Sequence, residues 1–392
     1  MDSACVETVG PPSLPRLFLS FLRLGTTAFG GPAMVAYIRR MAVERNKWLD
    51  DATFRDGVAL CQTIPGATAM QTAAYVGLRA RGVWGAAVAF SGFGMPAFCF
   101  MCILSFLYAR THDLPLALAA FHGLRAITVA IVAYATLSFG RVSLRRSADI
   151  FIAALAAVLF ALRVNPILVI LLAALAGLVL YRQATPKPQA TTEPAVPVGS
   201  RRPLPPLLLG VLVAFALLFV ANRGLFDLAI LMFRIDLFAF GGGFASVPLM
   251  YHEIVDVRSW MDNATFMNGI ALGQVTPGPI VITATFVGYW LHGILGAIVA
   301  TAGIFLPSFL MVVGVVPYYD RLRASAHFNR CISGILSSFV GLLLSVTIQF
   351  GLDVPWDVPR IVLAGAALAA LLLKVEVLWV VLAGLAVSMV IL

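Results

Sequence analysis

Two arginines, Arg23 and Arg234, lie inside apolar segments, and each stands six residues before a Phe-Gly-Gly sequence. A charge at that depth in a membrane protein costs several kcal/mol, so it usually marks a pathway, a partner or a ligand. Because the same cation occupies the same place twice, the pair is predicted to bind an anion. The alternative is that each side chain reaches towards an interface or pairs with an internal acid such as Asp227 or Asp236.

The glycine stretches that follow the arginines are Phe29-Gly30-Gly31-Pro32 and Phe240-Gly241-Gly242-Gly243. Adjacent glycines let the backbone leave helical geometry, and a proline disfavours helix before it. We therefore expect a break followed by a new half-helix, whose free N–H groups would form an anion site. The alternative is close helix packing by small residues, which is common in membranes.

A second pair of breaks reads Gln62-Thr63-Ile64-Pro65-Gly66 and Gln274-Val275-Thr276-Pro277-Gly278-Pro279. A regular helix cannot continue through two prolines around a glycine. Neutral amide and hydroxyl donors, exposed backbone N–H groups and an arginine together suit an oxyanion, whereas a mere kink is the alternative. The predicted substrate-binding residues are Arg23, Gly30, Gly31, Gln62, Thr63, Pro65, Gly66, Arg234, Gly241, Gly242, Gly243, Gln274, Thr276, Pro277 and Gly278.

These breaks belong to a longer internal duplication. Trp48-Leu49-Asp50 matches Trp260-Met261-Asp262, and Gly77, Gly82, Gly85 and Pro96 match Gly288, Gly293, Gly296 and Pro307. A duplicated apolar unit with Gly and Pro breaks at matching positions points to a transporter, in which broken helices build the substrate site where the two repeats meet.

The composition places the chain in a membrane. Of 392 residues, 61% are hydrophobic and only 11% are charged, whereas a soluble domain carries about 25% charged residues. The net charge of +9 is gathered in short clusters between apolar runs, as expected of the positive-inside bias and without any nucleic-acid motif. The first thirteen residues lack the basic start of a signal peptide, so the first apolar segment is expected to stay attached.

The predicted fold is an all-α polytopic membrane protein with two homologous, inverted repeats and about thirteen transmembrane segments, some of them discontinuous. The predicted segments are 14–38, 55–78, 83–109, 115–140, 148–163, 165–181, 206–222, 225–250, 266–290, 293–317, 329–350, 358–373 and 375–392. The domains are a first repeat at 1–181, a Pro-rich linker at 182–205, an extra transmembrane segment at 206–224 and a second repeat at 225–392.

The expected inversion of the second repeat follows from the number of membrane crossings before it. Six crossings return the chain to its starting side, and the extra segment then moves it across. The basic clusters favour an inside N-terminus and an outside C-terminus, except for the loop that holds Arg39, Arg40, Arg45, Lys47 and Arg55. If segment 14–38 turned back at Gly30-Gly31-Pro32, that loop would lie inside. With one such turn in each repeat, five crossings would make the repeats parallel, and this alternative stays open.

No enzyme signature is found: there is no Ser/His/Asp order, HExxH, P-loop or dinucleotide fingerprint. We therefore expect no enzyme activity, no catalytic residue, no metal and no cofactor. Of the five cysteines, Cys99 and Cys102 lie in an apolar run and are interpreted as packing residues. Transport would run on an ion or proton gradient or on the membrane potential, with Asp56, Asp227 and Asp236 as weak candidates for proton coupling.

The residues quoted above resemble the chromate transporter family in its long two-domain form. The resemblance rests on the two glycine stretches, on Gln274-x-x-Pro277-Gly278-Pro279, on the two halves and on the Pro-rich middle. One departure is Pro65-Gly66-Ala67, where the second repeat has Pro-Gly-Pro. The resemblance implies an exporter of the bacterial inner membrane that lowers cytoplasmic chromate and confers resistance, driven by the proton motive force or by anion exchange.

Several alternatives remain open at this stage. Chromate and sulfate are tetrahedral dianions of similar size, so an importer or exchanger of sulfate or another oxyanion is the main rival. A lipid-acting intramembrane enzyme and a non-transporting sensor are more remote. The predicted partners are the chromate or sulfate substrate and the lipid bilayer, with a homodimer left open and no nucleic acid.

Overall fold

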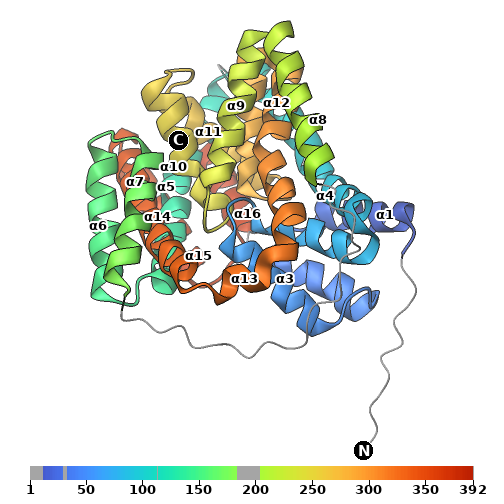
Figure 1. Ribbon diagram of the computed structural model, residues 1–392. Helices are drawn as coiled ribbons and strands as arrows, with labels where there is room; N and C mark the ends of the chain where they lie inside the picture. Colours follow the sequence, from blue (N-terminus) through green and yellow to red (C-terminus); the bar gives the residue numbers. More distant parts are fainter. Residues whose placement is uncertain (1–11, 30–32, 113, 183–203, 392) are drawn as a thin grey trace, which may run out of the picture.

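The computed structural model describes residues 12–29, 33–112, 114–182 and 204–391 (Figure 1). Within these ranges the regular structure is entirely helical, which confirms the predicted all-α class. The helices of the first half are α1 (Leu14–Thr27), α2 (Ala33–Arg39), α3 (Asp51–Thr63), α4 (Thr68–Thr111), α5 (Pro115–Ser143), α6 (Ser147–Ala161) and α7 (Pro166–Leu180). Then follow α8 (Leu204–Ala221), α9 (Arg223–Phe238), α10 (Ser246–Tyr251), α11 (Asn263–Val275), α12 (Thr283–Val315), α13 (Tyr319–Ala324), α14 (Ala326–Asp353), α15 (Val358–Leu372) and α16 (Val377–Ile391).

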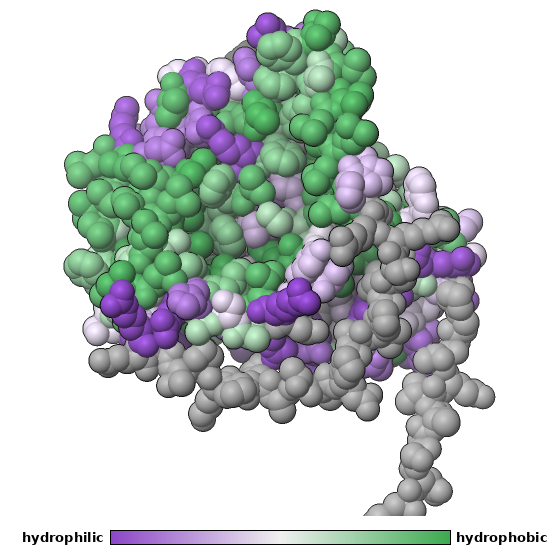
Figure 2. Space-filling view, viewed as in Figure 1, coloured by the Kyte–Doolittle hydropathy of each residue, from purple (hydrophilic) through white to green (hydrophobic). Residues whose placement is uncertain are grey.

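The exterior of the molecule is that of a multi-pass membrane protein. Figure 2 shows apolar side chains over the middle of the visible face, with polar residues gathered above and below. Helix α8 has no buried residue, and its Leu212, Leu217 and Val220 are largely exposed. Five helical stretches of the described chain are long and apolar enough to cross a bilayer: Thr68–Thr111, Leu118–Ser143, Leu204–Ala221, Ile280–Tyr318 and Ala326–Asp353. Such a surface belongs in lipid, because apolar area exposed to water is unfavourable.

The duplication is visible in the backbone itself. Gly66 has φ +115° and its equivalent Gly278 has φ +117°, while Lys47 and Ser259 have φ 50° and 48°. A π-helical turn also occurs in both copies, at Arg40–Arg45 and at His252–Val257. Because a non-glycine residue with positive φ is uncommon, its recurrence at the matching position confirms that the two halves are structural repeats.

Helix α4 reverses direction within its length. Arg81 and Gly82 are non-helical, so α4 consists of α4a (residues 68–80) and α4b (residues 83–111). A Cβ on Gly77 would lie 2.2 Å from the carbonyl oxygen of Gly85, so the two parts pack side by side at backbone contact. Helix α12 turns in the same way at His292 and Gly293, which gives α12a (residues 283–291) and α12b (residues 294–315).

The Pro-Gly break is also a point of return. The Tyr75 hydroxyl of α4a donates to the carbonyl oxygen of Thr53 near the start of α3, at 3.3 Å, and the Tyr75 ring covers Gly57. Helices α3 and α4a therefore form a hairpin that closes at Pro65. In the second repeat Gly269 of α11 lies under the ring of Phe286 of α12a. The predicted segments 55–78 and 266–290 are thus hairpins and not single helices.

The first apolar segment forms a hairpin as well. The Arg16 side chain of α1 reaches the Asn46 side chain beyond α2, at 3.5 Å, and the rings of Phe21 and Trp48 lie 6.5 Å apart. Segment 14–38 is therefore divided between two helices that return to the same end. Gly30, Gly31 and Pro32, where a helix break was predicted and a turn was the alternative to a full crossing, lie outside the described residues, as does most of the Pro-rich linker.

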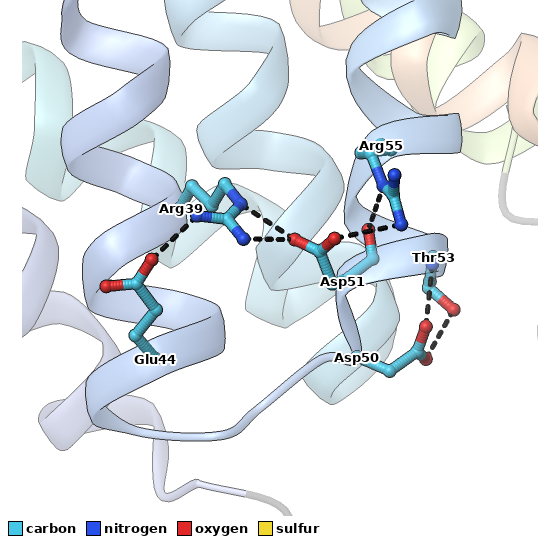
Figure 3. Close-up of polar contacts among 6 residues, drawn as sticks. All are labelled: Arg39, Glu44, Asp50, Asp51, Thr53 and Arg55. Carbon is cyan, nitrogen blue, oxygen red and sulfur yellow. Dashed lines mark hydrogen bonds and ion pairs between the residues drawn. The ribbon is translucent and has the colours of Figure 1, made fainter.

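An ion-pair network joins the bases of the two first-repeat hairpins (Figure 3). Asp51, at the start of α3, pairs with Arg39 of α2 at 2.6 Å and with Arg55 of α3 at 3.0 Å. Asp50 caps α3 by accepting from the Thr53 N–H at 2.8 Å. Partial burial disfavours the Asp50 carboxylate, but the hydrogen bonds from Thr53 outweigh it and hold the pKa of Asp50 below its ordinary value. The basic loop between α2 and α3 therefore lies at the same end as the start of α1.

The two repeats run in opposite directions. Asp56, at the base of the first-repeat hairpins, pairs with Arg323, which follows the C-terminal end of α12b, at 3.5 Å. Tyr108, near the C-terminal end of α4b, packs at 5.8 Å against Trp290, at the base of the second-repeat hairpins. The hairpin bases of the two repeats consequently lie at opposite ends of the long helices α4b and α12b, as predicted for inverted repeats.

Candidate functional site

Two reciprocal hydrogen bonds join the breaks of opposite repeats. The Gly66 N–H donates to the carbonyl oxygen of Ala239 at 2.8 Å, and the Gly278 N–H donates to that of Ala28 at 3.1 Å. We call residues 64–67 the Pro65 tip and residues 276–279 the Pro277 tip. Ala28 and Ala239 end α1 and α9 in equivalent positions. Each tip thus obtains from the other repeat the acceptor that a buried N–H requires.

Only glycine fits at the two positions where a tip contacts the opposite repeat. Gly66 and Gly278 both have φ in the left-handed region, which side chains rarely adopt. A Cβ on Gly66 would lie 2.1 Å from the Ser308 hydroxyl oxygen, and one on Gly278 would lie 2.8 Å from the Ala97 side chain. The predicted site residues Pro65, Gly66, Pro277 and Gly278 are all buried, and each of the two tips contacts the opposite repeat.

The second glycine stretch lies next to the start of α4a. Gly241 and Gly242 both have φ +96°, and Gly243 begins a short 3-10 turn. A Cβ on Gly242 would meet the hydroxyl of Thr68, the first residue of α4a, at 3.3 Å. The first-turn N–H groups of α4a are therefore directed towards this glycine stretch, where the helix dipole favours negative charge.

The polar side chains near the tips are unequal in the two repeats. Gln71, which is fully buried, donates from Nε2 to the Pro65 carbonyl oxygen at 2.5 Å. Gln274 is half-buried, and its Nε2 has no hydrogen-bond partner within the described chain. Gln62 is exposed. The hydroxyls of Thr63 and Thr276 each donate to a carbonyl three residues earlier, at 2.8 Å. Of the predicted amide donors, Gln274 is the one buried and available.

Arg23 lies on the exposed face of an amphipathic helix. The buried face of α1 carries Leu17, Phe21 and Gly25, whereas Arg23, Thr26 and Thr27 are exposed beside the end of the helix. Within the described residues no carboxylate pairs with Arg23. A polar stripe on a helix of a membrane protein needs water, a partner or a ligand next to it.

Arg234, the equivalent of Arg23, is neutralised by an acid. Its guanidinium pairs with Glu253, a largely buried carboxylate that also lies 3.5 Å from Arg258. Glu253 occupies the position that Met41 has in the first repeat, since the N–H groups of Arg258 and Asn46 bond to these two residues in the same way. The two arginines predicted as a symmetric pair therefore have different electrostatic surroundings.

The three acids predicted for proton coupling are spread over the molecule. Asp56 pairs with Arg323 at the hairpin base, and Asp227 is exposed near the start of α9. Asp236 is fully buried next to the Pro65 tip. Its Oδ2 accepts from the Ser308 N–H at 3.0 Å and from the Ser308 hydroxyl at 2.7 Å. Of the three acids, Asp236 alone lies where a Pro-Gly tip contacts the opposite repeat.

Ser308 and Arg125 are polar residues inside the bundle that were not predicted as site residues. Ser308 follows Pro307 directly and has Ala97 as its equivalent, so comparison of the repeats could have identified it. Arg125 of α5 donates to the Asn268 side chain at 3.1 Å, and Asn268 donates to the Tyr108 hydroxyl at 3.1 Å. The signal for Arg125 was its charge inside an apolar segment, the same signal that singled out Arg23.

Comparison with known proteins gives a consistent result. A family model described as chromate transporter matches residues 15–178 and again residues 226–389. An uncharacterized transporter of Methanocaldococcus jannaschii is 42% identical over 96% of this chain and 94% of its own length. Proteins named chromate transport protein are 30% identical in Cupriavidus metallidurans and 33% identical in Pseudomonas aeruginosa. Each of these covers 94% of this chain, and the chain covers 90% and 88% of their lengths. No solved structure matches the chain.

Proposed function

Because the chain belongs to the chromate transporter family, we propose that it moves chromate across the membrane as a secondary-active exporter. The observation that carries this proposal is the pair of reciprocal hydrogen bonds between the repeats, from Gly66 to Ala239 and from Gly278 to Ala28. It brings four chain breaks of two inverted repeats together, and transporters of this design hold their substrate at such a place. The relatives named chromate transport protein support the choice of oxyanion.

In the proposed site the charge and the hydrogen-bond donors come from different elements. Arg23 supplies a positive charge that no carboxylate of the described chain neutralises. The start of α4a and the Nε2 of Gln274, which has no partner among the described residues, supply donors for the anion oxygens. Arg234 remains a pathway residue, but an anion that reaches it has to compete with Glu253. Alternating access would arise as the hairpins of one repeat move against α4b and α12b.

We propose a topology with an odd number of crossings. The single crossings are α4b, α5, α8, α12b and α14, whereas the other helices form hairpins that return to the side where they begin. For example, Tyr181 at the end of α7 bonds to Asp149 at the start of α6. The N-terminus then lies inside and the C-terminus outside. In this topology the basic loop around Arg45 lies inside, like the other basic clusters, whereas in the thirteen-span prediction it would lie outside. The predicted domain division, with α8 as the extra segment that inverts the second repeat, fits this path.

The topology makes a direct prediction. A cysteine at the exposed position Arg45 is expected to react with an impermeant thiol reagent in inside-out vesicles and not in intact cells. A reporter fused to the C-terminus is expected to be active outside. If the position-45 cysteine were labelled from outside, segment 14–38 would cross the membrane, and the thirteen-span count would be preferred.

Transport itself is tested by flux into vesicles. Inside-out inner-membrane vesicles of a bacterial host that contain the protein are expected to accumulate labelled chromate when energised by a proton gradient or loaded with a counter-anion. Accumulation only in right-side-out vesicles would indicate an importer. Complete competition by sulfate, with labelled sulfate itself accumulated, would identify a broader tetrahedral-oxyanion exchanger, because donors aimed at four oxygens see nearly the same surface on both ions.

A further inference from the structure

The Pro65 tip is fastened to the second repeat by a chain of hydrogen bonds that ends on a buried acid. The Ala67 N–H donates to the Ser308 hydroxyl at 3.0 Å. That hydroxyl donates to Asp236 Oδ2 at 2.7 Å, and the Ser308 N–H donates to the same oxygen at 3.0 Å. Since Asp236 belongs to α9, Ser308 to α12b and Ala67 to the tip, three separate elements converge on one carboxyl group.

Two oxygens at this place have no donor among the described residues. Asp236 Oδ1 and Gln71 Oε1 are buried and lack a hydrogen-bond partner within the described chain. Both side chains flank Gly66: a Cβ built there would lie 2.8 Å from Gln71 Nε2 and 3.1 Å from Asp236 Oδ2. A buried acceptor without a donor is unfavourable, and more so if it is charged. Two neighbouring acceptors without donors call for a small cation or a proton.

Among the described residues, no cation contacts Asp236. The groups that face it are the amide of Gln71, the hydroxyl and N–H of Ser308 and the backbone of the Pro65 tip. No arginine, lysine or histidine of the described chain pairs with it. An ionised carboxylate with no exposed surface and no counter-charge is strongly unfavourable. A proton on Oδ1 removes the charge and supplies one of the missing donors.

The first repeat has no equivalent of this acid. The residues that correspond to Asp236 and Ser308 are Gly25 and Ala97. A Cβ on Gly25 would already lie 2.5 Å from the Phe93 carbonyl oxygen, so an acid would not fit there. The Pro277 tip therefore meets an apolar site, whereas the Pro65 tip meets a titratable carboxyl group.

We propose that Asp236 is the proton-binding site that couples proton movement to anion transport, and that its protonated form holds the Pro65 tip closed. This inference rests on the proposed transport function. In the closed arrangement, Asp236 Oδ1 carries the proton. Loss of that proton leaves a buried charge that only water can stabilise, so ionisation favours the state in which the tip has moved away from Asp236. The proton is bound from one side of the membrane and released to the other as the tip closes and opens.

The test uses Asp236→Asn in the full-length protein, with Asp227→Asn as the matched control on the same helix. Asparagine keeps the shape and the acceptor for Ser308 but cannot release a proton. One proton per cycle converts a pH difference of one unit into an about tenfold concentration ratio. In inside-out vesicles with an acidic lumen, Asp236→Asn is expected to lose this tenfold accumulation and to keep downhill chromate exchange, whereas Asp227→Asn keeps both.

A second measurement does not depend on chromate. Cys61 is fully buried in α3 beside the Pro65 tip, and its carbonyl accepts from Thr68. In a protein whose other four cysteines are serine, labelling of Cys61 is expected to increase with pH more steeply in Asp227→Asn than in Asp236→Asn, where only the ordinary formation of the reactive thiolate remains. Labelling and accumulation that respond to pH equally in Asp236→Asn and Asp227→Asn would overturn the proposal, as would dependence of both on sodium at constant pH. If the wild-type protein moved no chromate, the transport function would fail, and the Cys61 measurement alone would decide on the proton site.

Discussion

Replacing Arg23 with alanine is expected to abolish chromate resistance while leaving the amount of folded protein unchanged. Arg23 is exposed and has no carboxylate partner in the described chain, so its removal disturbs no packing. A hydrogen bond to a charged group contributes about 1.5–3 kcal/mol, which corresponds to an about 10- to 100-fold weaker affinity for the anion. Growth in chromate and initial flux in vesicles measure the loss, and thermal unfolding in detergent checks the fold.

The matched comparisons separate substrate binding from general charge. Arg45→Ala removes an exposed arginine at the base of the same repeat and is expected to leave resistance unchanged. Arg234→Met combined with Glu253→Gln removes the ion pair of the second repeat without leaving a buried charge unpaired, and it is expected to reduce flux less than Arg23→Ala. Full resistance in Arg23→Ala at normal expression would remove Arg23 from the site.

Replacing Gly66 with alanine is expected to destabilise the protein severely and to stop transport. The φ of +115° at this position strains any residue with a side chain, at about 1–3 kcal/mol. The new methyl group would also lie 2.1 Å from the Ser308 hydroxyl oxygen, and forcing an extra group into a packed site costs about 1–3 kcal/mol more. A lower melting temperature in detergent and loss of vesicle flux are the expected results.

Gly365→Ala provides the control for a glycine that the fold does not need. Gly365 lies in α15 with nothing within 4 Å of its Cβ position, so alanine there is expected to be neutral or slightly stabilising in a helix. If Gly66→Ala melted at the same temperature as Gly365→Ala and transported normally, the close crossing at the Pro65 tip would not exist in the working protein.

Much of this architecture could be predicted from residues that act locally. Pro65-Gly66 and Pro277-Gly278 cannot continue a helix, and both breaks occur where they were expected. The duplication predicted equivalent backbone positions, and the φ angles of Gly66 and Gly278 are nearly equal, at +115° and +117°. The class of protein followed from composition, since a chain with 11% charged residues cannot cover itself with polar surface.

The direction of the chain after each break could not be predicted, because it depends on contacts distant in sequence. Nothing near Pro65 indicates that Tyr75 returns to cover Gly57. Likewise, the symmetric role expected for Arg23 and Arg234 failed to anticipate Glu253, which is nineteen residues further along the chain than Arg234. Local patterns determine where a helix stops, whereas tertiary packing determines which partner a side chain meets.

The reciprocal bonds between Gly66 and Ala239 and between Gly278 and Ala28 bear on how such a chain arose. Neither repeat can complete its own break, because each needs a carbonyl group from the other. A one-repeat ancestor would therefore have worked as a pair of identical chains inserted in opposite directions. In the proposed topology, fusion through α8 would place both orientations in one polypeptide. From then on the halves were free to diverge, and Asp236 with Ser308 in one half, against Gly25 with Ala97 in the other, is a difference that no pair of identical chains could have evolved.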